Sequence, residues 1–154
     1  MRHFALKDEY RNLVIRLTSE TEISDVSQRP KKIKAKALWD TGAMMSAITP
    51  ETAKNLNLVS YDRIKVKGIK DEITLAGIAR VIIKLPDMPE IKSDVLICSL
   101  VKDIDFLIGM DIIQLGDFSI SNSGGKTLFT FAMPPFSDKT DLFEKATIVN
   151  KLLM

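Results

Sequence analysis

The sequence predicts a mostly β protein with a helix added at its C-terminal end. Short apolar runs recur along the chain and are separated by polar and turn-forming residues. Charged and apolar residues alternate between Lys31 and Trp39, which is the period of a half-buried strand. Beyond Pro134 and Pro135, apolar residues instead recur at helical spacing. The length of 154 residues suits one domain with a modest core.

Strands are expected where the apolar runs lie. They cover residues 13–17, 31–39, 63–69, 73–85, 94–99, 106–108, 118–121 and 127–131. Residues 18–28 form a polar stretch between the first two of these strands. The ranges 63–69 and 73–85 predict one hairpin. The last two strands predict another hairpin across Ser123-Gly124-Gly125, because glycine and serine favour tight turns.

Two short helical segments are expected inside the strand-rich region. Thr49 can cap a helix that begins at Pro50, because a threonine hydroxyl accepts from a free backbone amide and proline suits the first helical position. Residues 111–115 predict a helical turn that ends at Gly116.

The C-terminal helix presents one apolar stripe. The stripe consists of Leu142, Ala146, Val149 and Leu153, widened by Phe143, Ile148 and Leu152. Asp138 and Asp141 fall in the first turn, where the helix dipole favours carboxylates. Since an apolar stripe is usually part of a core, we expect it to pack on the chain's own body. Reinforcement of a dimer, or docking to a partner, is the alternative.

Composition excludes several function classes. The net charge of +2 gives no case for nucleic acid or an anionic membrane, and the short basic cluster at 29–32 reads as a solvated loop. The single cysteine, Cys98, allows no internal disulfide, and the only histidine is His3. This argues against a Cys-His or Ser-His-Asp enzyme and against a zinc site. We expect no metal, no cofactor and, without a signal-like or membrane-spanning run, a cytoplasmic protein.

One motif carries chemical information. Asp40-Thr41-Gly42 follows the apolar run 37–39 and precedes the small residue Ala43. Alone, the tripeptide could be an ordinary turn, because aspartate and glycine are common turn residues. Further along, the chain reads Ile108-Gly109-Met110-Asp111 after another apolar strand.

The two motifs together resemble the retropepsin-like aspartic proteases. In that family a hydrophobic strand enters Asp-Thr-Gly-Ala, a flap hairpin follows, and an apolar-Gly segment leads into a short helix. The resemblance implies a closed β-barrel over residues 11–132, with an N-terminal segment at 1–10 and a helical extension at 133–154. It also implies a flap, whose tip we assign to Gly68-Ile69-Lys70.

The resemblance implies that Asp40 is the catalytic carboxylate. Aspartic proteases activate a water between two carboxylates that share one proton. No other aspartate here is followed by Thr-Gly or Ser-Gly, so the second carboxylate must be Asp40 of another subunit, which makes the enzyme a homodimer. Thr41 would hydrogen-bond across the two-fold axis, Gly42 would let the backbone approach substrate, and Ala43 would narrow the floor of the site.

The chain departs from the retroviral pattern at two positions. Retroviral members have an aspartate and an arginine that form an ion pair where this chain has Met44 and Met110. Replacing both members of a buried pair by apolar residues leaves no unpaired charge. We therefore expect the two methionines to pack together. Asp111 is expected to form hydrogen bonds locally at the start of its helix rather than to act in catalysis.

These features favour a homodimeric aspartic endopeptidase, an acid protease that binds an extended polypeptide by adding a strand under the flap. The alternative is a non-catalytic peptide-binding or dimerisation module on the same fold. A third hypothesis, an unrelated β-barrel with a chance Asp-Thr-Gly turn, also stays open. Neither nucleic acid nor membrane is expected as a partner.

Overall fold

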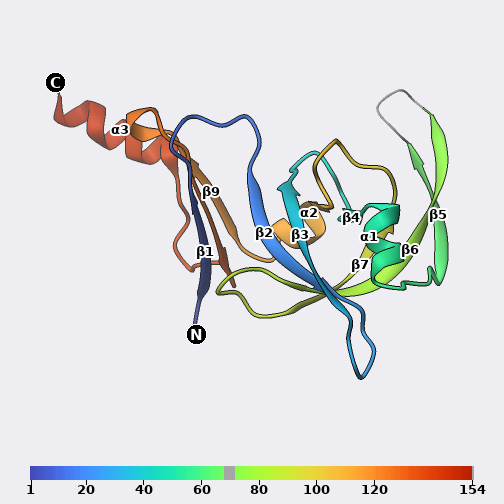
Figure 1. Ribbon diagram of the computed structural model, residues 1–154. Coiled ribbons are helices and arrows are strands. Elements are labelled where there is room, and N and C mark those ends of the chain that lie inside the picture. Colours follow the sequence, from blue (N-terminus) through green and yellow to red (C-terminus); the bar gives the residue numbers. More distant parts are fainter. Residues whose placement is uncertain (68–71, 154) are drawn as a thin grey trace.

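The computed structural model describes residues 1–67 and 72–153 and shows a strand-rich body with one peripheral helix (Figure 1). The strands are β1 (Phe4–Glu9), β2 (Thr18–Ser24), β3 (Lys32–Trp39), β4 (Ala47–Ile48), β5 (Asp62–Lys67), β6 (Ile73–Lys84), β7 (Ile91–Ile97), β8 (Phe106–Ile108), β9 (Asp117–Ser121) and β10 (Leu128–Met133). The helices are α1 (Pro50–Asn55), α2 (Met110–Ile113), the short 3₁₀ segment η1 (Ser123–Gly125) and α3 (Leu142–Leu152).

Most of the described strands form one closed ring. The seven-stranded sheet has the order β2-β3-β8-β4-β7-β6-β5, and β2 also pairs with β6 through Ile23 opposite Ile83. This extra pairing closes a ring of six strands and leaves β5 as the outer arm of a hairpin. The predicted closed, mostly β body with an added C-terminal helix is confirmed.

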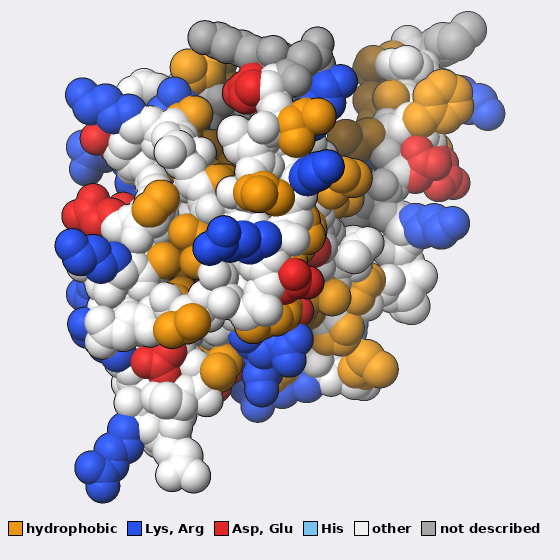
Figure 2. Space-filling view, turned by 90° about the vertical axis from the view of Figure 1, so that its right-hand side faces the viewer, with side chains coloured by type: hydrophobic (Ala, Val, Ile, Leu, Met, Phe, Trp, Pro, Cys, Tyr) orange, Lys and Arg blue, Asp and Glu red, His pale blue; other side chains and the backbone are white. Residues whose placement is uncertain are grey.

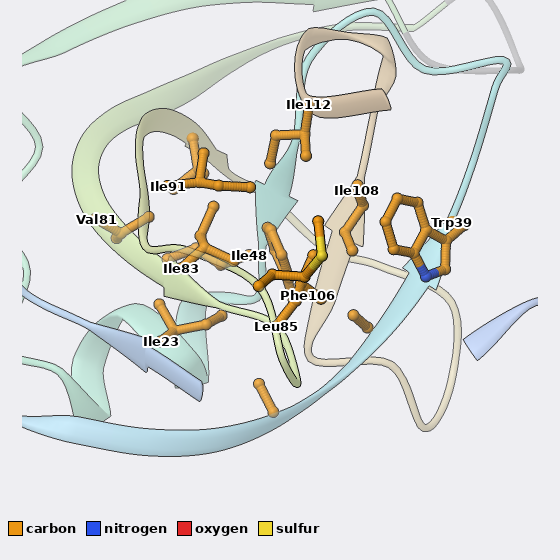
Figure 3. Packing of buried hydrophobic residues seen from close by; sticks show 14 of the residues in the cluster. Ile23, Trp39, Ile48, Val81, Ile83, Leu85, Ile91, Phe106, Ile108 and Ile112 are labelled. Carbon is orange, nitrogen blue, oxygen red and sulfur yellow. The ribbon is translucent and has the colours of Figure 1, made fainter. Parts of the chain in front are cut away.

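The ring encloses the main hydrophobic core. Figure 3 shows Ile23, Ile83, Phe106 and Ile108 pointing into a common interior, and each is fully buried. They come from β2, β6 and β8, so the core joins strands that are distant in the sequence. Burial of such side chains contributes about 1.5–3 kcal/mol each, which is enough to position the loops at the ends of the strands.

A second, three-stranded sheet stands beside the ring, with the order β1-β10-β9. Strand β1 pairs along its whole length with β10, from Phe4 opposite Met133 to Glu9 opposite Leu128. The first ten residues therefore contribute a strand to the body, although the sequence suggests a separate segment. The buried rings of Phe129 and Phe131 on β10 each lie 5.0 Å from the ring of Trp39, which joins this sheet to the ring.

The strand predicted at 13–17 is wrong. These residues form irregular backbone, and Ile15 is fully exposed. The strand lies instead in the following polar stretch, as β2. Its buried positions include Ser19 and Thr21, which satisfy their hydroxyls by bonding to Asp8 and to the carbonyl of Lys84. Because small hydrogen-bonded polar residues fill these inward positions, the apolar alternation typical of a strand is missing.

The predicted start of α1 is present, whereas α3 begins only at Leu142, so Asp141 stands at its start and the prediction that Asp138 lies in the first turn is wrong. The hydroxyl of Thr49 accepts from the amide of Thr52 at 3.1 Å, and Pro50 is the first residue of α1. Asp141 caps α3 by accepting from the amides of Phe143 and Glu144. These caps satisfy amides that have no partner inside the helix.

The apolar stripe of α3 is not covered by the chain. No residue of α3 is buried, and Phe143 is 82% exposed. Figure 1 shows the helix at the periphery, beside the three-stranded sheet and away from the ring. The expected packing of this helix on the chain's own body is therefore wrong, and residues 135–141, which lead into the helix, are exposed as well.

Charge is dispersed over the face that carries β5 and α1. Figure 2 shows lysine and arginine side chains there, separated by acidic and apolar ones. Among the described residues, no helix is long and apolar enough to cross a membrane.

Candidate active site

The Asp-Thr-Gly segment lies at the end of β8, the strand that is flanked by β3 and β4. Strand β3 runs parallel to β8, with Trp39 opposite Ile108, and β4 runs antiparallel to the other edge of β8. The connection between β3 and β4, residues 40–46, therefore crosses the end of β8. The amide of Asp40 donates to the carbonyl of Ile108 at 2.9 Å. The topology thus places the first motif directly against the second.

The loop is held by the side chain of its own aspartate. The amide of Gly42 donates to Oδ1 of Asp40 at 2.9 Å, and the amide of Ala43 donates to the Asp40 carbonyl at 3.2 Å. This is the turn in which an aspartate carboxylate binds the amide two residues later. Within the described residues, Oδ2 of Asp40 accepts no hydrogen bond. One carboxylate oxygen is positioned by the loop, and the other is available to a ligand or a water.

The second motif packs its backbone against the loop. The amide of Met110 donates to the carbonyl of Ala43 at 2.8 Å, and the amide of Asp111 donates to the carbonyl of Met44 at 3.2 Å. Gly109 makes this approach possible. A Cβ at Gly109 would lie 2.7 Å from the Met45 carbonyl carbon, a distance that real Cβ atoms do not show. Glycine is therefore required for close contact between the two segments.

Asp111 forms the expected local hydrogen bond at the start of α2. Its Oδ1 accepts from the amide of Ile112 at 3.0 Å. The same carboxylate also binds Ser46, whose hydroxyl in turn accepts from the amide of Gly109 at 3.0 Å. Ser46 is fully buried and lies outside both sequence motifs. A polar residue directly before the buried pair Ala47-Ile48 is the only local signal of its role.

The predicted contact between Met44 and Met110 is wrong within a single chain. Met44 is 86% exposed, so its side chain lies in solvent rather than against its counterpart. The reason is the backbone contact between the two segments: the Met44 carbonyl binds the amide of Asp111, and the side chain is left outside that contact. Met44 therefore offers an exposed apolar group beside Asp40.

The remaining predicted site residues are placed as follows. Thr41 is exposed, and its hydroxyl has no hydrogen-bond partner in the described part of the chain, so its role across a two-fold axis stays a prediction. Gly68, Ile69 and Lys70, assigned to the flap tip, lie outside the described residues. The hairpin that leads to them is formed by β5 and β6, paired from Asp62 opposite Ile78 to Lys67 opposite Ile73.

Asp40 borders an open hollow of about 430 Å³. The exposed side chains of Ile15 and Ile120 line it from the irregular segment before β2 and from β9. Neither residue belongs to a sequence motif of the site. Two exposed apolar side chains around a half-buried carboxylate form a surface suited to apolar polypeptide groups.

Comparison with known proteins supports the fold. No model of a known protein family matches the sequence, and no curated protein does. Among solved structures, the chain is similar to a retropepsin-like aspartic protease from Rickettsia conorii, with a TM-score of 0.55 and 17% identity. The similarity covers 86% of this chain and 97% of the other. The fold is that of the retropepsin-like aspartic proteases.

Proposed function

We propose that this protein is an aspartic endopeptidase that acts as a homodimer, with Asp40 of each subunit in the catalytic pair. One observation carries the proposal: Oδ1 of Asp40 is held by the Gly42 amide, while Oδ2 accepts no hydrogen bond from residues 1–67 or 72–153. The fold and the contact between the two motifs support it.

The chemistry requires two such carboxylates. An ionised Asp40 takes a proton from water, and the water oxygen bonds to the substrate carbonyl carbon. The protonated Asp40 of the other subunit donates its proton to the carbonyl oxygen. Collapse of the tetrahedral intermediate breaks the C–N bond as the first Asp40, now protonated, donates its proton to the amine nitrogen, and a hydroxyl of the intermediate returns a proton to the second Asp40. Two close carboxylates share one proton because both cannot ionise together, so they titrate as a pair.

A free strand edge supports dimerisation next to Asp40. Strand β10 offers no free edge for pairing between subunits, because it lies between β1 and β9. The outer edge of β9 has no partner among the described strands, and Ile120 on β9 lines the same hollow as Asp40. An unpaired edge is a template for pairing with another chain. Two copies of β9 would bring the two hollows together.

The test is cleavage of a diverse peptide library from mildly acidic to neutral pH. Wild type, Asp40→Asn and the matched control Asp138→Asn are compared; Asp138 lies in the exposed segment before α3. We expect wild type and the control to cleave and Asp40→Asn to be inactive. Cleavage that survives Asp40→Asn overturns the proposal. Peptide binding by all three proteins without cleavage would instead support the binding-module alternative.

Mixing subunits tests the dimer. When wild type is held at one concentration and Asp40→Asn protein is added in excess, mixed dimers form and each holds only one competent carboxylate. We expect cleavage to fall towards zero in proportion to the mixed fraction. Activity that does not change on addition of the variant would contradict a catalytic pair shared between subunits.

A further inference from the structure

Trp39, the residue before Asp40, lies at one end of a hydrogen-bond chain. Its indole Nε1 donates to Oγ of Ser19 at 2.9 Å. Oγ of Ser19 in turn donates to Oδ2 of Asp8 at 2.5 Å. The chain joins β3, β2 and β1, and it connects the N-terminal strand to the strand that carries the proposed catalytic carboxylate.

The direction of these hydrogen bonds follows from the chemistry of the groups. An ionised carboxylate only accepts, and an indole N–H only donates. A serine hydroxyl between them must donate to Asp8 and accept from Trp39. Ser19 is 3% exposed and Trp39 is 5% exposed, so neither group can replace its partner with bulk water. Loss of either partner would leave a buried polar group unsatisfied.

The hydrogen-bond chain from Asp8 through Ser19 to Trp39 completes the fixation of the indole. On the side of the three-stranded sheet, Phe129 and Phe131 contact the Trp39 ring, and such tilted contacts restrict its plane. Aromatic contacts alone allow sliding in the ring plane, whereas a hydrogen bond at Nε1 sets one position. The Trp39 amide also donates to the carbonyl of Leu17 at 3.0 Å. The residue before Asp40 is thus held by backbone, ring and polar contacts.

We infer that Asp8 is a positioning residue, which acts through Ser19 on the indole of Trp39 and so sets the place of the Asp40 loop. The expected effect on catalysis rests on the proposed function. The hydrogen-bond chain itself can be tested without any catalytic activity. The competing explanation is that the aromatic contacts suffice and that the chain adds only general stability. The two explanations differ in what happens to the loop when Asp8 loses its carboxylate.

Intrinsic fluorescence tests the hydrogen-bond chain directly, because Trp39 is the only tryptophan. The variants are Asp8→Ala, Asp8→Asn and Ser19→Ala in the full-length protein. The control is Glu9→Ala, which removes a neighbouring β1 carboxylate that pairs with the exposed Lys7 at 2.9 Å. We expect a blue shift of emission in Asp8→Ala and Ser19→Ala, a smaller one in Asp8→Asn, and none in the control. Asp8→Asn keeps an acceptor oxygen, so it separates loss of the hydrogen bond from misfolding.

The loop is followed by two further measurements. The amide resonance of Gly42, which binds Oδ1 of Asp40, should move in Asp8→Ala and stay in place in Glu9→Ala. On a peptide that wild type cleaves, kcat should fall about tenfold or more in Asp8→Ala with little change in KM, since small displacements of a reacting group are costly. Asp8→Asn should recover part of kcat.

Two results would overturn the inference. The first is Trp39 emission in Asp8→Ala equal to that of Glu9→Ala. The second is a Gly42 amide resonance that does not move in Asp8→Ala although the Trp39 emission shifts. That result would give the hydrogen-bond chain a structural role alone. Both readouts are independent of peptide cleavage. A failure of the proposed function would appear instead as an inactive wild type with these shifts intact.

Discussion

The carboxylate of Asp111 accepts hydrogen bonds from both the backbone amide of Ser46, at 3.0 Å, and its hydroxyl, at 2.7 Å. This pair connects the first turn of α2 to the end of the loop that carries Asp40. The Ser46 hydroxyl also accepts from the amide of Gly109. A polar contact therefore joins the two segments that carry the sequence motifs. One of its residues, Ser46, lies outside both motifs.

Removing this contact should destabilise the fold measurably. We expect Asp111→Ala to lower the free energy of unfolding by about 2–3 kcal/mol, because hydrogen bonds to a charged group are lost and buried Ser46 is left without its acceptor. Urea denaturation measures the change, with Asp138→Ala as the exposed control. A loss no larger than that of the control would show that Ser46 finds another acceptor.

Gly109→Ala should be among the most disruptive single-methyl changes in the chain. The added Cβ would meet backbone atoms of Met45 and Ala43 at 2.7–3.0 Å, and backbone cannot turn aside as a flexible side chain can. We expect a loss of about 3 kcal/mol, at the upper end for overpacking.

The control is Gly124→Ala, where φ is +65° but nothing lies within 4 Å of the new Cβ. Backbone strain alone should cost about 1 kcal/mol there. Thermal unfolding of both variants separates the clash from the strain. Equal losses would argue against tight contact between the two motifs.

Removal of α3 should leave the body intact. A chain that ends at residue 137 loses a helix with no buried residue, so we expect its stability to match the full chain within about 0.5 kcal/mol. Urea denaturation at several protein concentrations measures this. A loss that is present at high protein concentration and shrinks on dilution would instead place the apolar stripe of α3 in a subunit interface. A large loss at every concentration would contradict the exposed position of the helix.

The Arg80–Asp94 pair predicts one feature of acid stability. The guanidinium binds both carboxylate oxygens, at 2.7 and 2.9 Å, and this hydrogen bonding is the main cause that lowers the pKa of Asp94 below its ordinary value of 3.8. Because the folded-state pKa is lowered, the stabilisation is fully present above 3.8 and is lost as pH falls through the folded-state pKa.

We therefore expect Asp94→Asn to be slightly less stable than wild type at neutral pH and equally stable in strong acid. The neutral-pH difference is small because the pair is solvent-accessible. Denaturation curves at several pH values check this. A difference that widens as the pH falls would show that the pair does not lower the pKa of Asp94.

The sequence predicts an element well where its buried face is apolar. The alternation of β3 locates that strand within one residue, and Thr49 with Pro50 locates the start of α1. Strand β2 is missed because Ser19 and Thr21 fill inward positions with hydrogen-bonded hydroxyls. Local apolarity cannot reveal a strand whose burial depends on partners elsewhere in the chain.

For the candidate site, the sequence alone indicated the proposed catalytic group with its neighbours, Asp40-Thr41-Gly42, and a second motif that contains Gly109. These are local patterns with a chemical meaning of their own. Tertiary structure decided that Ser46 binds Asp111, that Asp8 reaches Trp39 through Ser19, and that α3 stays uncovered. Each of these three features depends on strand order and register, which bring distant residues within hydrogen-bonding distance or leave them apart. The spacing of residues along the sequence does not encode strand order or register.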